Sequence, residues 1–408
     1  MDDKTQTLNP ALPEFWLQKA IEIEAAFAEM RREKAVHWHD EPPSDWFPEG
    51  GRGFWSVVRY EDVVEVSRDQ ETFTSDHGTE IVDMTPEMVH IFGGMLNMSG
   101  AAHTHHRAIV NRVLTPRTVE ALSDTIRAHA RRCIDRVAAQ GGCDFMQDMV
   151  GDFPAQIICE LLGVPVDDRA RLVALTGTAL SAYGTAEAYN AMLEIIAYAE
   201  SLVALAREQV SDSASFLRKL LTAQVDGRHM SDHEIAVFFA LLATAGIETT
   251  ATSIGQGMYA LSLHPDQRRR WQSDFQQLAP RAVEEIVRWV TPVRYFRRTA
   301  TRDTVLAGQP IAKGDKVVMW YTSANRDESV IERAGELDFA RAEDRHVAFG
   351  GGGPHFCLGA VLARKEMTIF FEELFARLPD IEVNGEPERL HSNFVNGLAA
   401  LPVRYTPA

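Results

Sequence analysis

One cysteine, Cys357, lies in the stretch of this sequence whose residue types point most clearly to chemistry. Four glycines, Gly350 to Gly353, precede the sequence PHFCLG, and a helical pattern begins at Ala360. Glycine has no Cβ, so its backbone can turn sharply and approach a partner closely. A cysteine just before a helix has its sulfur near free N–H groups and the positive end of the helix dipole. This position favours the thiolate, which is the form that binds metals.

Three kinds of site could use this loop. A phosphate-binding loop would need Gly-Lys-Ser/Thr after the glycines, and Phe-Cys-Leu-Gly stands there instead. A cysteine nucleophile would need a paired base, which the sequence alone leaves open. A buried structural cysteine would explain Cys357 but not its neighbours. A thiolate bound to haem iron accounts for the glycines, His355, Cys357 and Gly359 together, so we favour that interpretation.

The same residues resemble the cysteine loop of the cytochrome P450 family, Phe-Gly-x-Gly-x-His-x-Cys-x-Gly. His355, Cys357 and Gly359 occupy the family positions, but Phe349 lies eight residues before the cysteine where the family has seven. The resemblance implies haem b as the cofactor, with the Cys357 thiolate as the axial ligand of its iron. It also assigns Phe349, Gly350, His355 and Gly359 to cofactor binding.

A long buried helix is expected further upstream. Ser231 and Glu234 form a capping-box pattern that predicts its start. Its first half is apolar nearly all round, which is typical of a buried helix. Glu248 then interrupts the apolar run, where an unpaired charge is costly. Threonines follow, and their hydroxyls can bond back to main-chain carbonyls and loosen the helix.

The sequence AGIETT at 245–250 is similar to the oxygen-activation motif of the same family, Ala/Gly-Gly-x-Asp/Glu-Thr-Thr. By this resemblance Ala245 and Gly246 lie against the haem and the bound oxygen. Glu248 takes part in proton relay, and Thr249 hydrogen-bonds to the oxygen that is being activated.

Two further segments resemble haem-contacting regions of the family. His103 and Arg107 are four residues apart, on one face of a predicted helix, and match the family pattern His-Thr-x-x-Arg. Arginine can form a forked pair of bonds to a carboxylate, so Arg107 is expected to bind a haem propionate. Arg298, in the segment PVRYFRRT, matches a second propionate-binding arginine. Without the haem loop, a solvated basic face would be the ordinary interpretation of such a cluster.

Glu285 and Arg288 are three residues apart and share one side of a predicted helix. Such pairs are common by chance, but this one resembles the structural Glu-x-x-Arg pair of the family. It is therefore expected to support the fold rather than the chemistry.

The substrate pocket is predicted from resemblance and from apolar composition. Methionines suit adaptable apolar surfaces, and the segment 77–96 is rich in them. The helical region 174–200 would form the roof. Arg294 could anchor a carboxylate or a ketone, or it could face solvent. The candidate pocket residues are Ile81, Val82, Met84, Met88, Phe92, Val293, Arg294, Phe296 and Val395.

Composition fits a large globular protein. The 408 residues are 45% hydrophobic and show no linker, which predicts one domain over 1–408, mainly α with small β-sheets, as in the P450 fold. A net charge of −17 argues against nucleic acid as a partner. The four cysteines form no CxxC pair, and the polar start contains no apolar run suited to a signal peptide or membrane anchor. We therefore expect a cytoplasmic protein.

The resemblance implies a monooxygenase that inserts one oxygen atom of O2 into a C–H bond of an apolar small molecule. Electrons would come from a separate ferredoxin and an NAD(P)H-dependent ferredoxin reductase. Arg112, Arg364 and Lys365 are candidates for the docking face. The alternatives are a peroxide-driven haem-thiolate enzyme and a non-catalytic haem protein. Three segments resemble those of bacterial members that act on sterols, terpenoids and methyl-branched lipids. They are the cysteine loop, the TPV segment at 291–293 and the FVNG turn at 394–397.

Overall fold

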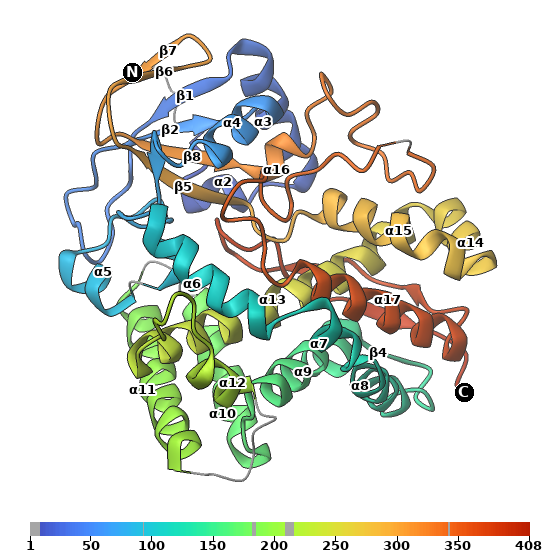
Figure 1. The fold of residues 1–408 in the computed structure, drawn as a ribbon. Coiled ribbons are helices and arrows are strands. Elements are labelled where there is room, and N and C mark those ends of the chain that lie inside the picture. The colour runs from blue at the N-terminus through green and yellow to red at the C-terminus, as the bar shows by residue number, and fades with distance from the viewer. Residues whose placement is uncertain (1–8, 93, 182–184, 209–215, 342) are drawn as a thin grey trace.

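Helices make up most of the molecule in this computed structural model, and the strands of its largest sheet gather at one end of it (Figure 1). The structure describes residues 9–92, 94–181, 185–208, 216–341 and 343–408. The α-helices are α2 (Pro13–Trp16), α3 (Ala20–Glu33), α4 (Tyr60–Arg68), α5 (Pro86–Phe92), α6 (Gly100–Val113), α7 (Pro116–Glu120), α8 (Ser123–Asp135), α9 (Asp152–Leu162), α10 (Val166–Ser181), α11 (Ala186–Glu208), α12 (Phe216–Thr222), α13 (Asp232–Leu263), α14 (Pro265–Ser273), α15 (Phe275–Val290), α16 (Tyr321–Ala324) and α17 (Ala360–Arg377). A 3-10 helix, η1 (Met95–Asn97), and a π-helix, η2 (Phe145–Val150), complete the helical elements that are described.

The largest sheet has the strand order β1-β2-β8-β5-β3, in which only the β2–β8 pair is parallel. Every residue of β8 is buried, so this strand forms the centre of the sheet. Three small sheets pair β6 with β7, β10 with β11, and β4 with β12 and β9. The strands are β1 (Val36–His39), β2 (Phe54–Val57), β3 (Phe73–Thr74), β4 (Gly142–Asp144), β5 (Tyr295–Ala300), β6 (Thr304–Leu306), β7 (Gln309–Ile311), β8 (Lys316–Trp320), β9 (Glu382–Val383), β10 (Glu388–Arg389), β11 (Leu398–Ala400) and β12 (Pro402–Arg404). The prediction of a mainly α fold with small sheets is confirmed.

Helix α13 runs through the middle of the molecule and packs against α9, α11 and α15 (Figure 1). The predicted capping box is present: the Ser231 hydroxyl accepts the Glu234 N–H at 3.2 Å, and the Glu234 carboxylate accepts the Ser231 N–H at 2.7 Å. The helix is unbroken over Asp232–Leu263, so the threonines after Glu248 do not interrupt it. Its apolar sides therefore form much of the core.

By length and composition alone, α11 and α13 are apolar enough to cross a membrane, as is the bent pair Phe145–Leu162 with Val166–Leu180 if it counts as one span. Within the molecule, 67% of the apolar window of α13 and 39% of that of α11 is buried. The apolar residues of α13 are thus used mainly for packing against neighbouring helices.

The Glu285–Arg288 pair at the end of α15 is buried and fully bonded. The Arg288 guanidinium donates to both Glu285 carboxylate oxygens, at 2.7 and 2.8 Å. It also donates to the main-chain carbonyls of Asn325, Ala334 and Glu336, at 2.9, 2.7 and 2.7 Å. Five donors thus meet five acceptors, and the segment that leads to the cysteine loop is tied to α15.

Candidate functional site

The cysteine loop leads into the N-terminus of α17. The Cys357 N–H donates to the Phe349 carbonyl at 2.8 Å, which closes the loop on itself. The Phe349 ring lies 6.4 Å from the Phe356 ring, centroid to centroid, and the Arg364 guanidinium stacks over it at 4.4 Å. Phe349 therefore stays next to the cysteine, and the additional glycine is absorbed elsewhere in the loop.

The glycine run 350–353 packs against the C-terminal end of α4. Gly350, Gly352 and Gly353 have φ angles of +99°, +85° and +76°, which favour glycine. A Cβ on Gly351 would lie 2.8 Å from the Ser67 Cβ, and one on Gly353 would lie 2.7 Å from the Ser67 carbonyl oxygen. Two of the four glycines thus allow loop and helix to approach closely, a use that the sequence did not indicate.

The Cys357 side chain is open on one side, while protein atoms surround the rest of it. This burial raises the pKa of the Cys357 thiol, although the N–H groups of Gly359 and Ala360 and the charges of Arg107 and Arg364 oppose it. The stabilising contacts expected at a helix N-terminus are therefore present, but they do not outweigh burial. A metal that binds such a thiol deprotonates it outright, so metal binding would produce the thiolate that the N–H groups alone do not.

Four basic side chains gather beside this loop. The rings of His103 and His355 are 4.2 Å apart, centroid to centroid, and Arg107 donates to the Phe356 carbonyl at 2.6 Å. Burial lowers the pKa of His103 to about 4 and that of His355 to about 2, and the positive charges of Arg107 and Arg298 add to both shifts. The two histidines are therefore neutral, and the two arginines carry the positive charge of the cluster.

The cluster has few partners of its own. Both ring nitrogens of His103 are buried and find no hydrogen-bond partner among the described residues. The bond found for Arg298 joins its guanidinium to the neighbouring Arg297 carbonyl at 2.8 Å. Among the described residues, neither Arg107 nor Arg298 forms an ion pair with a carboxylate. A buried cation, Arg298, a half-buried one, Arg107, and an unsatisfied histidine beside a cysteine suit a cofactor that carries carboxylates and a metal.

The sequence AGIETT at 245–250, predicted to be an oxygen-activation motif, lies on α13. The Thr249 hydroxyl donates to the Ala245 carbonyl at 2.6 Å, and both residues line the main cavity. Glu248 is not part of this lining, and burial raises the pKa of its carboxyl group. A Cβ on Gly246 would lie 2.6 Å from the Ile158 side chain of α9, so this glycine also allows the two helices to pack.

A further buried carboxyl group, Glu366, was not predicted. It lies on α17, hydrogen-bonds to Thr250, and has one carboxyl oxygen without a partner. Burial raises its pKa to about 8. The available signal was a glutamate inside the pattern LARKEMTIFF, where charged and apolar residues alternate too closely to reveal which of them is buried.

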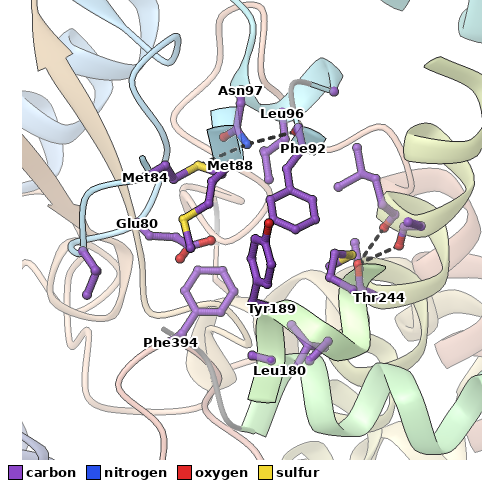
Figure 2. Close-up of a pocket in the computed structure, with 18 of the residues that line it drawn as sticks. Glu80, Met84, Met88, Phe92, Leu96, Asn97, Leu180, Tyr189, Thr244 and Phe394 are labelled. Atoms are coloured by element: carbon purple, nitrogen blue, oxygen red, sulfur yellow. Dashed lines mark hydrogen bonds between the residues drawn. The ribbon is translucent and has the colours of Figure 1, made fainter. Parts of the chain in front are cut away.

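A cavity of about 220 Å³ lies between α13, α11, the segment 80–97 and the residues around 293–296 and 394–395. Figure 2 shows the rings of Phe92 and Tyr189 near its centre, with Thr244 on one side and Glu80 on the other. The predicted pocket residues that line it are Val82, Met84, Met88, Phe92, Val293, Phe296 and Val395.

Two predicted pocket residues do not line the cavity. Ile81 is buried in the core that packs on the largest sheet. Arg294 is buried with its guanidinium 4.1 Å from the Trp16 ring, and its Nε donates to the Val395 carbonyl at 3.4 Å. Sequence reasoning missed Trp46, which lines the cavity and whose ring lies 5.3 Å from that of Tyr189, a cavity residue in the predicted roof 174–200. Only the fold brings these two distant segments together.

The residues predicted to form a docking face are already engaged. Arg364 forms a two-point ion pair with Glu284 in addition to its stacking on a phenylalanine. Lys365 pairs with Glu120 at 2.9 Å, and Arg112 donates to a main-chain carbonyl. Two of the three positive charges are therefore neutralised within the chain.

Comparison with known proteins identifies the class. Residues 183–389 match the family model described as Cytochrome P450. The chain is 40% identical over 402 residues to the methyl-branched lipid omega-hydroxylase of Mycobacterium tuberculosis, covering 96% of this chain and 93% of the relative. It is 39% identical over 392 residues to the steroid C26-monooxygenase of Mycolicibacterium smegmatis, covering 93% and 90%. A solved cytochrome P450 of Mycobacterium marinum in complex with pseudoionone is 36% identical, with a TM-score of 0.89 and coverage of 96% and 97%.

The chain belongs to the cytochrome P450 family. It is an oxidoreductase of the monooxygenase class, and its cofactor is haem b. The residues around Cys357 fit this cofactor, because the exposed cysteine lies beside the buried Arg298 and the half-buried Arg107, neither of which pairs with a carboxylate among the described residues.

Proposed function

We propose that this P450 hydroxylates an elongated lipid-like substrate: a steroid, a terpenoid or a methyl-branched lipid. The observation that carries the proposal is the mainly apolar cavity that reaches Ala245 and Thr249 on α13. Two relatives that match nearly the whole chain are named for hydroxylation of methyl-branched lipids and oxidation of steroids, which supports the same substrate class.

The proposed cofactor contacts follow from the basic cluster and the cysteine loop. Cys357 would supply the axial sulfur ligand, and Arg107 and Arg298 would bind the haem carboxylates, assisted by His103. The neutral His355 lies against His103 and would pack at the same edge. Phe349, Gly350 and Gly359 would line the cysteine side.

The chain's own part in the reaction is to hold the substrate, exclude water and move protons. When bound, haem supplies the oxidising chemistry, and a thiolate ligand favours cleavage of the O–O bond. The raised pKa of Glu248 means that its carboxyl group keeps a proton at higher pH than an exposed glutamate does. Glu248 can therefore serve as a proton donor, and the Thr249 hydroxyl, now bonded to the Ala245 carbonyl, can pass a proton or hold oxygen in place.

Removal of the Thr249 hydroxyl tests this division of roles. Thr249→Ala should keep the thiolate-ligated haem spectrum, but the product formed per reducing equivalent should fall by about tenfold or more, with peroxide as the waste product. Thr244→Ala is the matched control, because Thr244 lies on the same helix, lines the same cavity and bonds back to Ala240. Fully coupled turnover in Thr249→Ala would contradict the role of this hydroxyl.

Electrons would come from a ferredoxin and its NAD(P)H-dependent reductase, and the cytoplasm is the expected compartment. Because Arg364 and Lys365 are paired within the chain, Arg112 is the docking candidate that lacks an ion pair among the described residues. A peroxide-driven enzyme is not favoured by the family relationship.

The substrate class is tested by titrating the holoenzyme with steroids, terpenoids and methyl-branched fatty compounds while following the haem absorption. Ligands that shift the spectrum are then incubated with a reconstituted ferredoxin chain, and the products are identified. Hydroxylated lipid is the expected result. Binding of small polar aromatics alone would contradict the proposal, and efficient product formation with hydrogen peroxide alone would favour the peroxide-driven alternative.

A further inference from the structure

Three segments that are far apart in the sequence meet at one carboxylate next to the cysteine loop. Glu284 of α15 accepts hydrogen bonds from the Arg364 guanidinium of α17 and from the His346 ring, which lies at the start of the loop. The His346 Nε2 lies 2.9 Å from a Glu284 oxygen, and the Arg364 Nη2 lies 2.9 Å from the same oxygen. The cysteine loop is therefore joined to α15 and α17 through side chains.

Both donors are fixed in orientation by their bonds. The His346 Nδ1 accepts the Ala348 N–H at 3.2 Å, so the Nε2 carries the proton that is donated to Glu284. Arg364 places Nε and Nη2 on the two oxygens of Glu284, which is the forked geometry of a strong ion pair. Burial alone would raise the pKa of Glu284, but Arg364 and His346 outweigh it and lower this pKa to about 2. The carboxylate is thus ionised at neutral pH and holds both donors.

The same two side chains lie against the Phe349 ring. The Arg364 guanidinium carbon is 4.4 Å from the centroid of this ring, and the His346 ring is 5.8 Å from it, centroid to centroid. A guanidinium over an aromatic face is attracted by the electrons of the ring. Glu284 fixes this guanidinium in turn, so the Phe349 ring is restrained from two elements at once.

Phe349 passes this restraint to Cys357 through the main chain. Its carbonyl accepts the Cys357 N–H at 2.8 Å, and the Gly359 and Ala360 N–H groups bond to the Cys357 sulfur. A displacement of Phe349 would therefore move Cys357 relative to the two N–H donors of its sulfur. Hydrogen bonds to a ligating sulfur are one of the means by which a protein sets the reduction potential of bound iron.

Another arginine of α17 shows what an ion pair looks like without this connection. Arg377 pairs with Asp135 and Glu373, and its side chain is 33% exposed, close to the 35% of Arg364. No aromatic ring lies under the Arg377 guanidinium among the described residues. An ion pair that only joins two helices thus needs no aromatic partner, and the contact with Phe349 distinguishes Arg364.

We propose that Arg364 is a positioning residue: fixed by Glu284, it holds Phe349 in place and thereby sets the reduction potential of the iron bound at Cys357. The inference rests on the proposed ligation by Cys357 and names residues that act on it indirectly. It also explains why the additional residue of the loop does not displace Phe349. The ring is restrained by its own contacts rather than by its spacing from the cysteine.

The test is a redox titration of the haem-loaded protein with dyes, which measures the midpoint potential without a partner protein. Arg364→Gln should shift this potential to a more negative value, so that the equilibrium constant for reduction falls about threefold or more. The potential falls because the N–H bonds to the sulfur weaken when Phe349 is released, and because a positive charge is lost. Arg377→Gln is the matched control and should leave the potential unchanged.

Two further variants separate positioning from charge. Arg364→Lys keeps the charge but cannot form the forked pair with Glu284, so it should restore the potential only in part. In a Phe349→Leu background, Arg364→Gln should shift the potential far less than in the wild type, because no ring remains to be held.

Three results would overturn the inference and leave the cofactor proposal intact. They are full restoration by Arg364→Lys, equal shifts in the two backgrounds, and an unchanged potential in Arg364→Gln that keeps the thiolate signal in electron paramagnetic resonance. Absence of a thiolate signal in the wild type would overturn both proposals.

Discussion

Two buried arginines, Arg288 and Arg298, differ in how their charges are balanced. Arg288 lies at the end of α15, and all five of its donors reach acceptors within the chain, including both oxygens of Glu285. Arg298, on β5, is buried to a similar degree but is bonded to one carbonyl group in the described structure. Arg288 is fully bonded within the chain, whereas Arg298 has no carboxylate partner among the described residues, which supports its proposed contact with a haem carboxylate.

This difference shows how structural and cofactor-binding charges can be told apart. A buried ion pair that the protein satisfies itself ties segments together, and removing one partner leaves an uncompensated charge. A buried cation that the protein leaves unpaired is costly until an anion arrives. By this criterion Arg288 supports the fold, and the buried Arg298 remains the stronger of the two arginines proposed to bind haem carboxylates.

The largest effect on stability is expected at Arg288, whose partners all lie within the chain. Arg288→Ala should lower the free energy of unfolding by about 3–5 kcal/mol, with or without haem, because it leaves Glu285 buried with fewer partners. Chemical denaturation of both forms measures this. Arg333→Ala is the control, since Arg333 forms exposed pairs with Glu336 and Asp338 and its removal should change the stability little. An equally small loss of stability in Arg288→Ala would contradict the structural role of Arg288.

Arg298, in contrast, should matter mainly for holding the cofactor and little for the stability of the haem-free protein. Arg298→Ala removes an unpaired buried cation, so the haem-free protein should lose little stability, while haem should dissociate about tenfold or more faster. Transfer of haem to an excess of apomyoglobin measures the rate. Arg302→Ala, at an exposed position just beyond the same strand, should leave the rate unchanged. Unchanged haem retention in Arg298→Ala would mean that this arginine does not bind the cofactor.

Two glutamates of α17 extend the comparison to acids. Burial raises the pKa of Glu366 to about 8, so the folded chain keeps a proton that the unfolded chain loses above its ordinary pKa of 4.5. This effect lowers stability as pH rises between those two values. Glu366→Gln removes it, so the variant should gain about 2 kcal/mol relative to wild type between about pH 5 and about pH 7.

Glu373 on the same helix is the matched case, because Arg127 and Arg131 bond to it and lower its pKa despite burial. Glu373→Gln should cost stability at neutral pH, and this cost should shrink as pH falls below the ordinary glutamate pKa. Denaturation curves at several pH values compare the two variants. Parallel pH dependences for Glu366→Gln and wild type would contradict the assignment of a buried neutral carboxyl group.

The sequence predicted the parts of the site that short spacings define. The capping box at Ser231, the cysteine before α17 and the Glu285–Arg288 pair depend on neighbours within a few residues, and each is found as expected. The extra residue of the cysteine loop was also visible, although its consequence was not. The hydrogen bond from Cys357 to the Phe349 carbonyl keeps the phenylalanine in place.

What the sequence could not predict depends on partners from distant segments. Gly351 and Gly353 are small because Ser67 lies against them. Lys365 was a candidate docking residue until the fold paired it with Glu120. Trp46 lies far from the other cavity residues in the sequence, and only the fold brings its ring against Tyr189 at the cavity wall.

The most direct test of the central claim is electron paramagnetic resonance of the oxidised, haem-loaded protein, which distinguishes sulfur from nitrogen as the axial ligand of iron. The account predicts a thiolate signal in the wild type and in Arg298→Ala, and loss of that signal in Cys357→Ala. A nitrogen-only signal in the wild type, or an unchanged thiolate signal in Cys357→Ala, would contradict it.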